Sequence, residues 1–373
     1  MILHVVTDFS TQGGAQAMLA RLLAHSGERA VVVALTEVSD RCRAMAGNDN
    51  VEYISLQARS PLSFPRAIWR IARLIRVHKP DVVLCWMYHA MVVGLIAKLI
   101  SMRRVPVIWT VRQALDDPAA FTRSTRVAVG LSQKLSRFSD GIIYNSTRAL
   151  QQHAKYGFSE ANASVVPNGF LLPKNVQSRK GPARVFGLAA RFHPQKDFET
   201  FFRAFAIARR SVPDLTARLA GDGVTADNAA LRDLLTENNL SEDSVVLCGD
   251  LHDMSNFYDS IDMLVLSSRT EGFPNVIAEA MSYGRPVVTT DVGDAAKIVG
   301  ESGYVVPARD AQALGQSLTD AANWSSEEYG GRSQAARDCI ADSYSLAAIA
   351  EAYDSVLRGV GTQARASTAP HAG

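Results

Sequence analysis

The sequence has few cysteines, and none of them is placed for a crosslink or a metal cluster. The 373-residue chain contains four, Cys42, Cys85, Cys248 and Cys339, which lie far apart and form neither a C-x-x-C pair nor a Cys/His cluster. This spacing argues against a zinc site and against a disulfide framework. We expect reduced thiols, as in a cytoplasmic protein.

The sequence also lacks a long uninterrupted apolar run. Its longest apolar stretch, 86–100, contains His89 and Lys98 and is shorter than the roughly 18 to 20 residues that cross a bilayer. The first nine residues have neither the basic start nor the apolar core of a signal peptide, and they resemble a buried strand. We therefore expect a cytoplasmic protein with a buried helix in 86–100.

Three ligand-binding motifs are absent. The sequence contains no G-x-G-x-x-G and no G-x-x-x-x-G-K-[ST], which weakens a dehydrogenase or P-loop interpretation. It also contains no Asp-x-Asp triplet of the kind that holds Mg²⁺ or Mn²⁺ against a diphosphate. We expect no metal and no cofactor.

Charge is unevenly distributed along the chain, although the net charge is only +2. Residues 1–168 contain 20 Lys and Arg against 11 Asp and Glu (+9), and residues 169–373 contain 19 against 26 (−7). Part of the positive excess lies on a predicted helix, 65–78, where Arg66, Arg70 and Arg73 follow helical spacing. Two interpretations stay open: a solvated helix face, or attraction to an anionic membrane surface.

Short Val/Ile-rich runs alternate with helical patterns, which is the βαβ rhythm of a parallel sheet. The rhythm stops in a polar, turn-rich passage and then begins again. We expect an α/β protein with two Rossmann-like, doubly wound domains facing a central cleft, residues 1–168 and 183–344, joined by a linker at 169–182. A last helix is expected at 345–361, followed by a disordered tail at 362–373. The predicted strands are Leu3–Thr7, Ala30–Leu35, Val82–Cys85, Val107–Val111, Gly141–Asn145, Val185–Ala189, Thr216–Ala220, Val245–Leu247, Met263–Ser267 and Pro286–Thr290.

The segment 267–290 predicts a strand end, a loop, a helix and a second strand. Pro274 suits the first turn of that helix because it has no N–H to leave unsatisfied, and Gly284 suits its left-handed end. The start of the helix would point N–H groups and a positive dipole end toward an anion. The residues expected around this anion are Gly272, Phe273, Asn275 and Val276.

Two carboxylates flank the same helix start. Glu271 precedes the helix and Glu279 follows eight residues later, about one turn inside it, so both can face one ligand at different depths. Either carboxylate alone would most simply be a solvated acid of a βαβ unit.

Two cations follow another predicted strand. Arg191 lies just after the strand at 185–189, and Lys196 lies at the opening of a helix that runs through 201–208. Cations on a strand-end loop can hold a diphosphate, Arg through its forked donors and Lys as a point charge. Two surface charges are the simpler alternative.

Together these motifs resemble the E-x7-E signature and the Arg/Lys pair of the family 4 retaining glycosyltransferases. Tyr144-Asn-Ser and Val166-Pro-Asn-Gly-Phe are similar to the subgroup that builds bacterial surface polysaccharides. The resemblance implies a GT-B fold. Arg191 and Lys196 would neutralise the leaving nucleoside diphosphate, Glu271 would contact the donor sugar, and Glu279 would bind the ribose. Asp197 departs from the glycine that usually follows the lysine, and we expect it to cap the helix.

The resemblance also points to residues in the first half of the chain. Gly13 and Gly14 open a helix after the first strand, and the family's glycine-rich loop reaches toward the donor diphosphate. His89 follows another strand end, where it either contacts the transferring sugar or the acceptor, or makes a hydrogen bond at a helix start. Arg112 stands where many relatives carry histidine, and the sequence assigns it no role. The final helix, 345–361, would cross back onto the first domain.

The resemblance implies a metal-independent retaining hexosyltransferase. It would move a sugar from a nucleoside-diphosphate sugar, with a UDP-sugar favoured, to a glycan acceptor, which we expect to be a lipid-linked oligosaccharide. The expected partners are this donor, this acceptor and the anionic inner face of the cell membrane, with no nucleic acid. Two alternatives stay open: a sugar-nucleotide epimerase of the same fold, which needs no acceptor, and a non-catalytic nucleotide-sugar-binding partner in a polysaccharide assembly complex.

Overall fold

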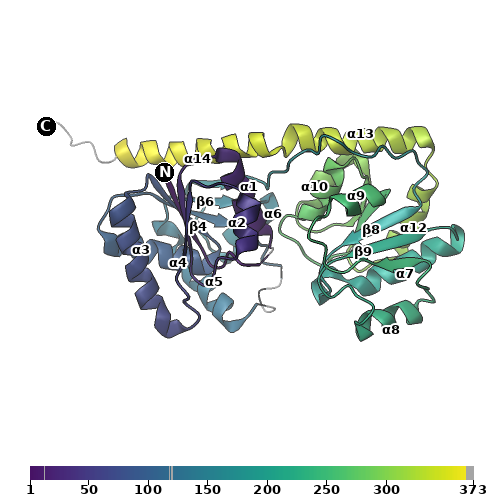
Figure 1. Ribbon diagram of the computed structural model, residues 1–373, viewed down its shortest axis with the longest axis horizontal. Helices are drawn as coiled ribbons and strands as arrows, with labels where there is room; N and C mark the ends of the chain where they lie inside the picture. Colours follow the sequence, from purple (N-terminus) through teal and green to yellow (C-terminus); the bar gives the residue numbers. More distant parts are fainter. Residues whose placement is uncertain (12, 117, 119–120, 367–373) are drawn as a thin grey trace. The chain divides into compact units, whose positions relative to one another are not determined.

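The chain folds into two compact α/β units (Figure 1). The structure is a computed structural model, and it describes residues 1–11, 13–116, 118 and 121–366. The first unit comprises Met1–Gly169 together with the C-terminal segment that begins at Leu346, and the second comprises Phe170–Ser345. Among the described residues, no helix is both long and apolar enough to span a lipid bilayer.

The first unit is built on a seven-stranded parallel sheet with the order β3-β2-β1-β4-β5-β6-β7. Consecutive strands are joined by helices, and the order reverses between β1 and β4, as in doubly wound folds. The strands are β1 (Ile2–Val6), β2 (Ala30–Ala34), β3 (Val51–Ser55), β4 (Val82–Trp86), β5 (Val107–Val111), β6 (Gly141–Tyr144) and β7 (Ala163–Val165). The α-helices are α1 (Gly14–Ser26), α2 (Asp40–Ala46), α3 (Phe64–His78), α4 (Tyr88–Ser101), α5 (Arg123–Leu135), α6 (Thr147–Tyr156) and α14 (Leu346–Ala366).

Helices cover both faces of this sheet, because its strands are apolar on both sides. Strand β4 shows the alternation: Val83 and Cys85 pack in the core beneath α3, α4 and α5, whereas Leu84 and Trp86 pack in the core shared with α1, α2 and α14. The last helix therefore forms part of the first unit's hydrophobic core, although its sequence follows the whole of the second unit.

A buried arginine helps to hold α14 on the first unit. The Arg112 guanidinium lies over the rings of Trp86 and Tyr353, 5.5 and 5.3 Å from their centroids, and donates to the Val166 carbonyl oxygen at 3.1 Å. It also donates to Asn168 Oδ1 at 3.0 Å. Burial lowers the pKa of Arg112 to about 9, so it remains charged at neutral pH. These contacts give Arg112 a structural role that the sequence did not assign.

The second unit is built on a six-stranded parallel sheet with the order β10-β9-β8-β11-β12-β13. The strand order reverses between β8 and β11: β9 and β10 lie on one side of this pair, and β12 and β13 lie on the other. The strands are β8 (Val185–Ala189), β9 (Thr216–Ala220), β10 (Val245–Leu247), β11 (Met263–Leu266), β12 (Val287–Thr290) and β13 (Tyr304–Val306). The α-helices are α7 (Phe198–Ser211), α8 (Ala229–Glu237), α9 (Ser255–Ser260), α10 (Asn275–Ser282), α11 (Ala295–Val299), α12 (Ala311–Ala322) and α13 (Ser326–Ser343).

The structure confirms the parallel α/β class and the ten predicted strands, each within one residue at either end. It adds β3, β7 and β13, which the sequence did not predict. The stretch 86–100 is not helical throughout, because Trp86 still belongs to β4 and the helix begins at Tyr88.

The predicted tail is wrong in its first part. Helix α14 continues to Ala366, since Gln363, Ala364 and Arg365 are good helix formers, and so 362–366 is helical. The rest of the predicted tail, 367–373, lies outside the described residues.

Candidate active site

Two loops of the second unit are joined where the strand order reverses. The loop after β8 and the loop after β11 follow neighbouring parallel strands, so both emerge at the carboxyl edge, where open α/β sheets bind ligands. Gln195 connects them in both directions: its carbonyl oxygen accepts from the Arg269 N–H at 2.8 Å, and its side chain donates to the Thr270 oxygen at 2.8 Å. Ser267 Oγ donates to the Lys196 oxygen at 2.8 Å. This network brings together two motifs that are far apart in the sequence.

Lys196 and Glu271 form the centre of this site. Lys196 Nζ lies 2.5 Å from Glu271 Oε1, and the two side chains are 20% and 12% exposed. Ser268 Oγ also donates to Glu271 Oε1, at 2.7 Å. The sequence predicted that both residues serve one ligand, and the structure places their side chains in direct contact.

Asp197 occupies the N-cap position of α7, as predicted, but its left-handed backbone and its bond to a side chain of the helix are not those of an ordinary cap. Its backbone is left-handed (φ 51°, ψ 56°), which explains why a glycine would be suited to this position, and its side chain makes no capping bond to α7. Instead its carboxylate lies 2.7 Å from Arg269 Nη2 and accepts from Thr200 Oγ1 at 2.8 Å. Burial alone would raise the pKa of Asp197, but the hydrogen bonds from Arg269 and Thr200 outweigh it and lower the pKa. Asp197 therefore fastens the β11 loop to the start of α7.

Arg191 is exposed on the loop after β8. Its neighbours are fixed to the loop after β9: the Ala190 N–H donates to the Ala220 oxygen at 2.8 Å, and the Phe192 N–H donates to the Asp222 oxygen at 2.7 Å. Between these bonds lies Gly221, with φ of 148°, where an added Cβ would stand 2.1 Å from the Ala190 oxygen. Gly221 was not predicted as a site residue from the sequence. The signal for it was the Gly-x-Gly at 221–223, directly after a predicted strand.

Glu279 is held by a tyrosine from the preceding helix. It lies on α10, and its Oε2 accepts from the Tyr258 hydroxyl at 2.8 Å. The Tyr258 ring is buried and packs 5.3 Å from the ring of Tyr283. Tyr258 was not predicted from the sequence, because nothing local connects α9 with a carboxylate on α10.

The loop that carries Glu271 is packed tightly against Gly293. An added Cβ at Gly293 (φ 56°) would lie 2.5 Å from the Gly272 oxygen and 2.9 Å from the Glu271 oxygen. Phe273, which the sequence placed at the ligand, is buried, and its ring stacks 6.0 Å from that of Phe170. The side chain of Phe273 thus belongs to the core, and only its backbone is available to a ligand. Helix α10 begins at Asn275 and Gly284 has φ of 66°, as predicted for the helix end.

The candidate residues of the first half, Gly13, Gly14 and His89, lie in the first unit. Gly13 caps α1, which begins at Gly14, after a loop ordered by Asp8: its carboxylate accepts from Thr36 Oγ1 at 2.6 Å and from the Ser10 N–H at 3.0 Å. Burial would raise the pKa of Asp8, but the hydrogen bonds from Thr36, Ser10 and Thr11 lower it overall.

His89 lies in the first turn of α4, where its Nε2 is 2.9 Å from Ser124 Oγ. Burial lowers the pKa of His89, against the opposing effect of the bond to Ser124, so the imidazole is neutral at pH 7. This geometry agrees with the helix-start alternative and leaves the half-buried ring able to donate or accept one further hydrogen bond.

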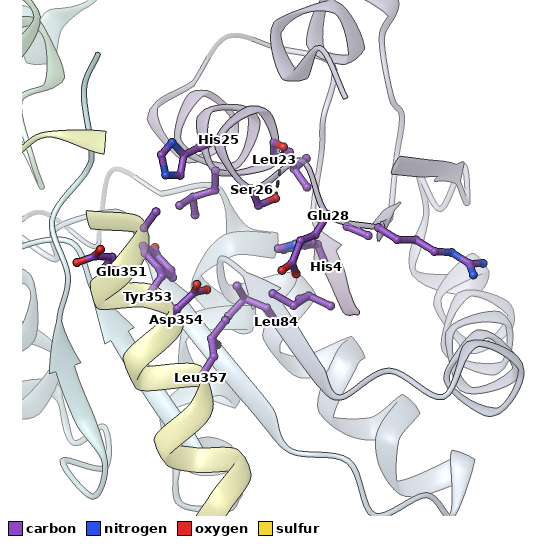
Figure 2. A pocket seen from close by; sticks show the side chains of 15 residues that line it. His4, Leu23, His25, Ser26, Glu28, Leu84, Glu351, Tyr353, Asp354 and Leu357 are labelled. Carbon is purple, nitrogen blue, oxygen red and sulfur yellow. Dashed lines mark hydrogen bonds between the residues drawn. The ribbon is translucent and has the colours of Figure 1, made fainter. Parts of the chain in front are cut away.

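A separate cavity of about 260 Å³ lies in the first unit between α1 and α14 (Figure 2). Its lining includes Ile2 and Ala30 at the starts of their strands, His4, and the acids Glu351 and Asp354. Burial lowers the pKa of His4 to about 3, and its Nδ1 accepts from Trp86 Nε1 at 3.2 Å. None of the predicted site residues lines this cavity, so it is distinct from the site of the β8 and β11 loops.

Comparison with known families matches both units. The family described as "Glycosyl transferases group 1" matches residues 183–323, and the family described as "Glycosyl transferase 4-like domain" matches residues 13–169. The chain belongs to the group 1, family 4-like glycosyltransferases. The residues that carried the resemblance, Arg191, Lys196, Glu271 and Glu279, all lie inside the first of these matches.

Curated relatives of this glycosyltransferase include bacterial enzymes named for lipopolysaccharide and capsular polysaccharide synthesis, and peptide N-acetylglucosaminyltransferase subunits. It is 31% identical over 137 residues to the lipopolysaccharide core biosynthesis mannosyltransferase LpcC of Rhizobium leguminosarum, covering 35% of this chain and 39% of the relative. It is 29% identical over 143 residues to a UDP-Gal:alpha-D-GlcNAc-diphosphoundecaprenol alpha-1,3-galactosyltransferase of Escherichia coli, covering 35% and 36%. The alignments span about a third of the length of these curated relatives.

Solved structures show that the glycosyltransferase has the GT-B fold. Anabaena HepE in complex with UDP superposes with a TM-score of 0.82 at 22% identity, over 96% of this chain and 99% of that one. The lipopolysaccharide outer core galactosyltransferase WaaB superposes with a TM-score of 0.72 at 16% identity, over 96% and 99%. At these identities the likeness concerns the fold.

Proposed function

We propose that the protein is a retaining glycosyltransferase that moves a hexose from a nucleoside-diphosphate sugar, preferentially a UDP-sugar, to a lipid-linked glycan in the synthesis of a bacterial surface polysaccharide. The observation that carries this proposal is the contact of Lys196 with Glu271 at the reversal of the second sheet, with Arg191 on the same loop. HepE, which has been solved in complex with UDP and with UDP-glucose, and the E. coli relative, whose name includes UDP-Gal, support the choice of uracil nucleotide.

The charges of the site suit departure of a nucleoside diphosphate. As the bond from the sugar to the phosphate breaks, negative charge grows on the leaving oxygen, and a cation fixed in advance stabilises it without reorganisation. Lys196 is such a cation, because Glu271 and the surrounding network hold its position. Arg191, exposed on the same loop, has forked donors suited to the second phosphate. We propose that these two cations supply the charge that a metal ion provides in other transferases, and that the phosphate released from the sugar takes the proton of the acceptor hydroxyl.

The donor is identified by thermal-shift measurements with UDP, GDP and ADP and with their sugars. Ligand that binds only the folded state raises the melting temperature in proportion to the logarithm of saturation. We expect UDP and UDP-sugars to give the largest shift, unchanged by EDTA. A larger shift with GDP or ADP would reject the uracil assignment, and loss of the shift in EDTA would reject metal independence.

Replacing Tyr258 with phenylalanine tests the role of Glu279 in binding the nucleotide. The variant removes the hydroxyl that holds the carboxylate at 2.8 Å and leaves the buried ring in place. Because a hydrogen bond to a charged group contributes about 1.5 kcal/mol or more, we expect UDP to bind about tenfold more weakly, with kcat at saturating donor changed much less. Isothermal titration and steady-state kinetics measure the two effects. Tyr304→Phe, which removes the hydroxyl that accepts from Trp324 in the same unit, is the matched control.

Incubation of the donor without acceptor separates transfer from epimerisation. A glycosyltransferase leaves most of the nucleotide sugar unchanged under these conditions, whereas an epimerase converts it to a second nucleotide sugar that proton NMR resolves. Accumulation of such an epimer would replace the proposed reaction.

A further inference from the structure

The cavity between α1 and α14 lies where the strands of the first sheet begin (Figure 2). Ile2 and Ala30, the first residues of β1 and β2, line it. Doubly wound sheets bind their usual ligands at the opposite edge, beyond the carboxyl ends of the strands. None of the residues assigned to sugar transfer lines this cavity, so the transfer reaction gives it no role.

The inner wall of the cavity is mostly apolar. Leu23 of α1, Leu84 of β4 and Leu357 of α14 line it and are buried. An apolar cavity of about 150 Å³ can hold benzene, and pockets for drug-sized ligands begin at about 300 Å³. The volume of about 260 Å³ therefore suits one ring with a short side chain.

His4 provides a hydrogen-bond donor at this wall. Its Nδ1 accepts from Trp86 Nε1 at 3.2 Å, so the proton of the neutral imidazole is on Nε2. The ring lines the cavity and is buried, and Nε2 makes no hydrogen bond to any residue that the structure describes. A buried N–H without an acceptor is unfavourable, so His4 favours an occupant that brings an oxygen acceptor.

Tyr353 provides a second polar group without a partner. It lines the cavity from α14 and is 2% exposed, and within the described part of the chain its buried hydroxyl has no hydrogen-bond partner. Its ring stacks 6.4 Å from that of Trp86, the residue that also holds His4, so the two polar groups flank one side chain. Since a hydroxyl group both donates and accepts, a ligand hydroxyl at this end of the cavity is suited to both.

The rim of the cavity is acidic. Glu28, Glu351 and Asp354 line it and are exposed, and none of the three forms an ion pair with another described residue. Glu351 and Asp354 lie three residues apart on α14 and so share one side of the helix. Arg29 is the one lysine or arginine among the lining residues. The excess of carboxylates favours a ligand with a positive charge at its outer end.

We propose that the cavity between α1 and α14 binds a small aromatic amine that carries a hydroxyl group. The hydroxyl lies at His4 and Tyr353, the ring packs against the buried leucines, and the ammonium lies at Glu351 and Asp354. A purely apolar ligand would leave the inner polar groups unpaired, and an anionic one would meet the carboxylates of the rim. The ligand would also hold α14 against β1 and β4. The proposal goes beyond the transfer reaction and does not depend on it.

Tyramine is the probe, and two analogues of similar length test its two ends. Phenethylamine lacks the hydroxyl, and 4-hydroxyphenylacetate has a carboxylate in place of the ammonium. Isothermal titration of the whole protein without nucleotide sugar should show saturable binding of tyramine. We expect phenethylamine to bind at least about fivefold more weakly and 4-hydroxyphenylacetate not to bind measurably. Absence of saturable tyramine binding, or equally tight binding of the carboxylate analogue, would overturn the proposal.

Nitrogen-15 NMR of the histidine side chains reports binding at the cavity itself. Tyramine should shift the Nε2 resonance of His4 and leave that of the exposed His252 unchanged. Saturable binding that leaves the His4 resonance unmoved would place tyramine elsewhere and contradict the proposed site.

A change of volume on α14 blocks the cavity. Ala350 lines it, so Ala350→Leu should fill part of the space and abolish tyramine binding. Ala348→Leu makes the same change at an exposed position of the same helix, outside the lining, and should bind tyramine like the parent. Unfolding midpoints show whether each variant is folded. Binding that survives Ala350→Leu, or is lost equally in Ala348→Leu, would reject the site.

Removal of charge at the rim is an independent test that leaves the interior unchanged. Glu351→Gln with Asp354→Asn should weaken tyramine binding at least about fivefold. Asp49→Asn with Glu160→Gln, which removes two exposed acids of the first unit outside the cavity, should have no effect. Equal affinity in the two double variants would show that the rim does not bind the ammonium and would refute the assignment of an amine.

Discussion

Replacing Lys196 with alanine is expected to lower kcat by about 10²- to 10³-fold and to weaken UDP-sugar binding much less. The ammonium lies against Glu271 and is positioned before any ligand arrives, so its main effect should be on the charge that develops as the diphosphate leaves. The alanine variant also removes the ammonium from Glu271 and keeps the hydrogen bond from the Ser268 hydroxyl, which would place a less compensated carboxylate beside the donor sugar. Initial rates at saturating donor, together with the dissociation constant of UDP, separate the two effects.

A matched charge removal provides the control. Arg203→Ala deletes one cation from the exposed pair that Arg203 forms with Glu199 on α7, in the same unit, and should leave kcat unchanged. Lys196→Arg keeps the charge on a larger group and should recover part of the activity. If Lys196→Ala raised KM while kcat stayed at the parent value, Lys196 would bind donor and transition state equally and would not stabilise the leaving group.

Replacing Gly221 with alanine should destabilise the second unit by about 3 kcal/mol and displace the loop of Arg191. The backbone at Gly221 has φ of 148°, which residues with a Cβ rarely adopt, and the new Cβ would stand 2.1 Å from the Ala190 carbonyl oxygen. Both the strain and the overlap act on backbone that immediately precedes Arg191. Urea unfolding should therefore show a lower midpoint, and UDP binding should be lost or greatly weakened even where the variant is folded.

The same glycine-to-alanine substitution is expected to have the opposite effect on stability at Gly330. It lies within α13, and an added Cβ would meet nothing within 4 Å. Gly330→Ala should stabilise the protein by up to about 1 kcal/mol, because alanine loses less backbone entropy in a helix. A Gly221→Ala variant as stable as the parent would show that the Ala190 loop can move away at little cost.

The local sequence predicted the central strands of both sheets but missed three of the strands at their edges. Strands such as β5 (Val107–Val111) and β8 (Val185–Ala189) are continuous apolar runs, because they are covered on both faces, and their bounds were predicted from sequence. The three strands that were missed, β3, β7 and β13, each lie at the edge of a sheet. An edge strand pairs on one side only and is less completely buried, so its composition contains less of the apolar signal.

At the site, sequence identified residue types and the structure identified their partners. The E-x7-E spacing and the Arg/Lys pair pointed to Glu271, Glu279, Arg191 and Lys196, and all four lie in the unit that carries the β8 and β11 loops. That Glu279 is held by Tyr258 could not be predicted, because the two residues are brought together only when α9 and α10 pack. Asp197 shows the same limit: its sequence position suggested a cap, whereas its bond to Arg269 depends on a loop 72 residues away.

The sequence by itself determined which segments are strands and which loops carry cations and carboxylates, because both of these properties are local. Only the tertiary structure decided that Lys196 contacts Glu271 and that Gly221 supports the Arg191 loop. Those outcomes follow from the parallel order of the strands, which places the ends of β8, β9 and β11 at one edge of the second sheet regardless of their separation along the chain.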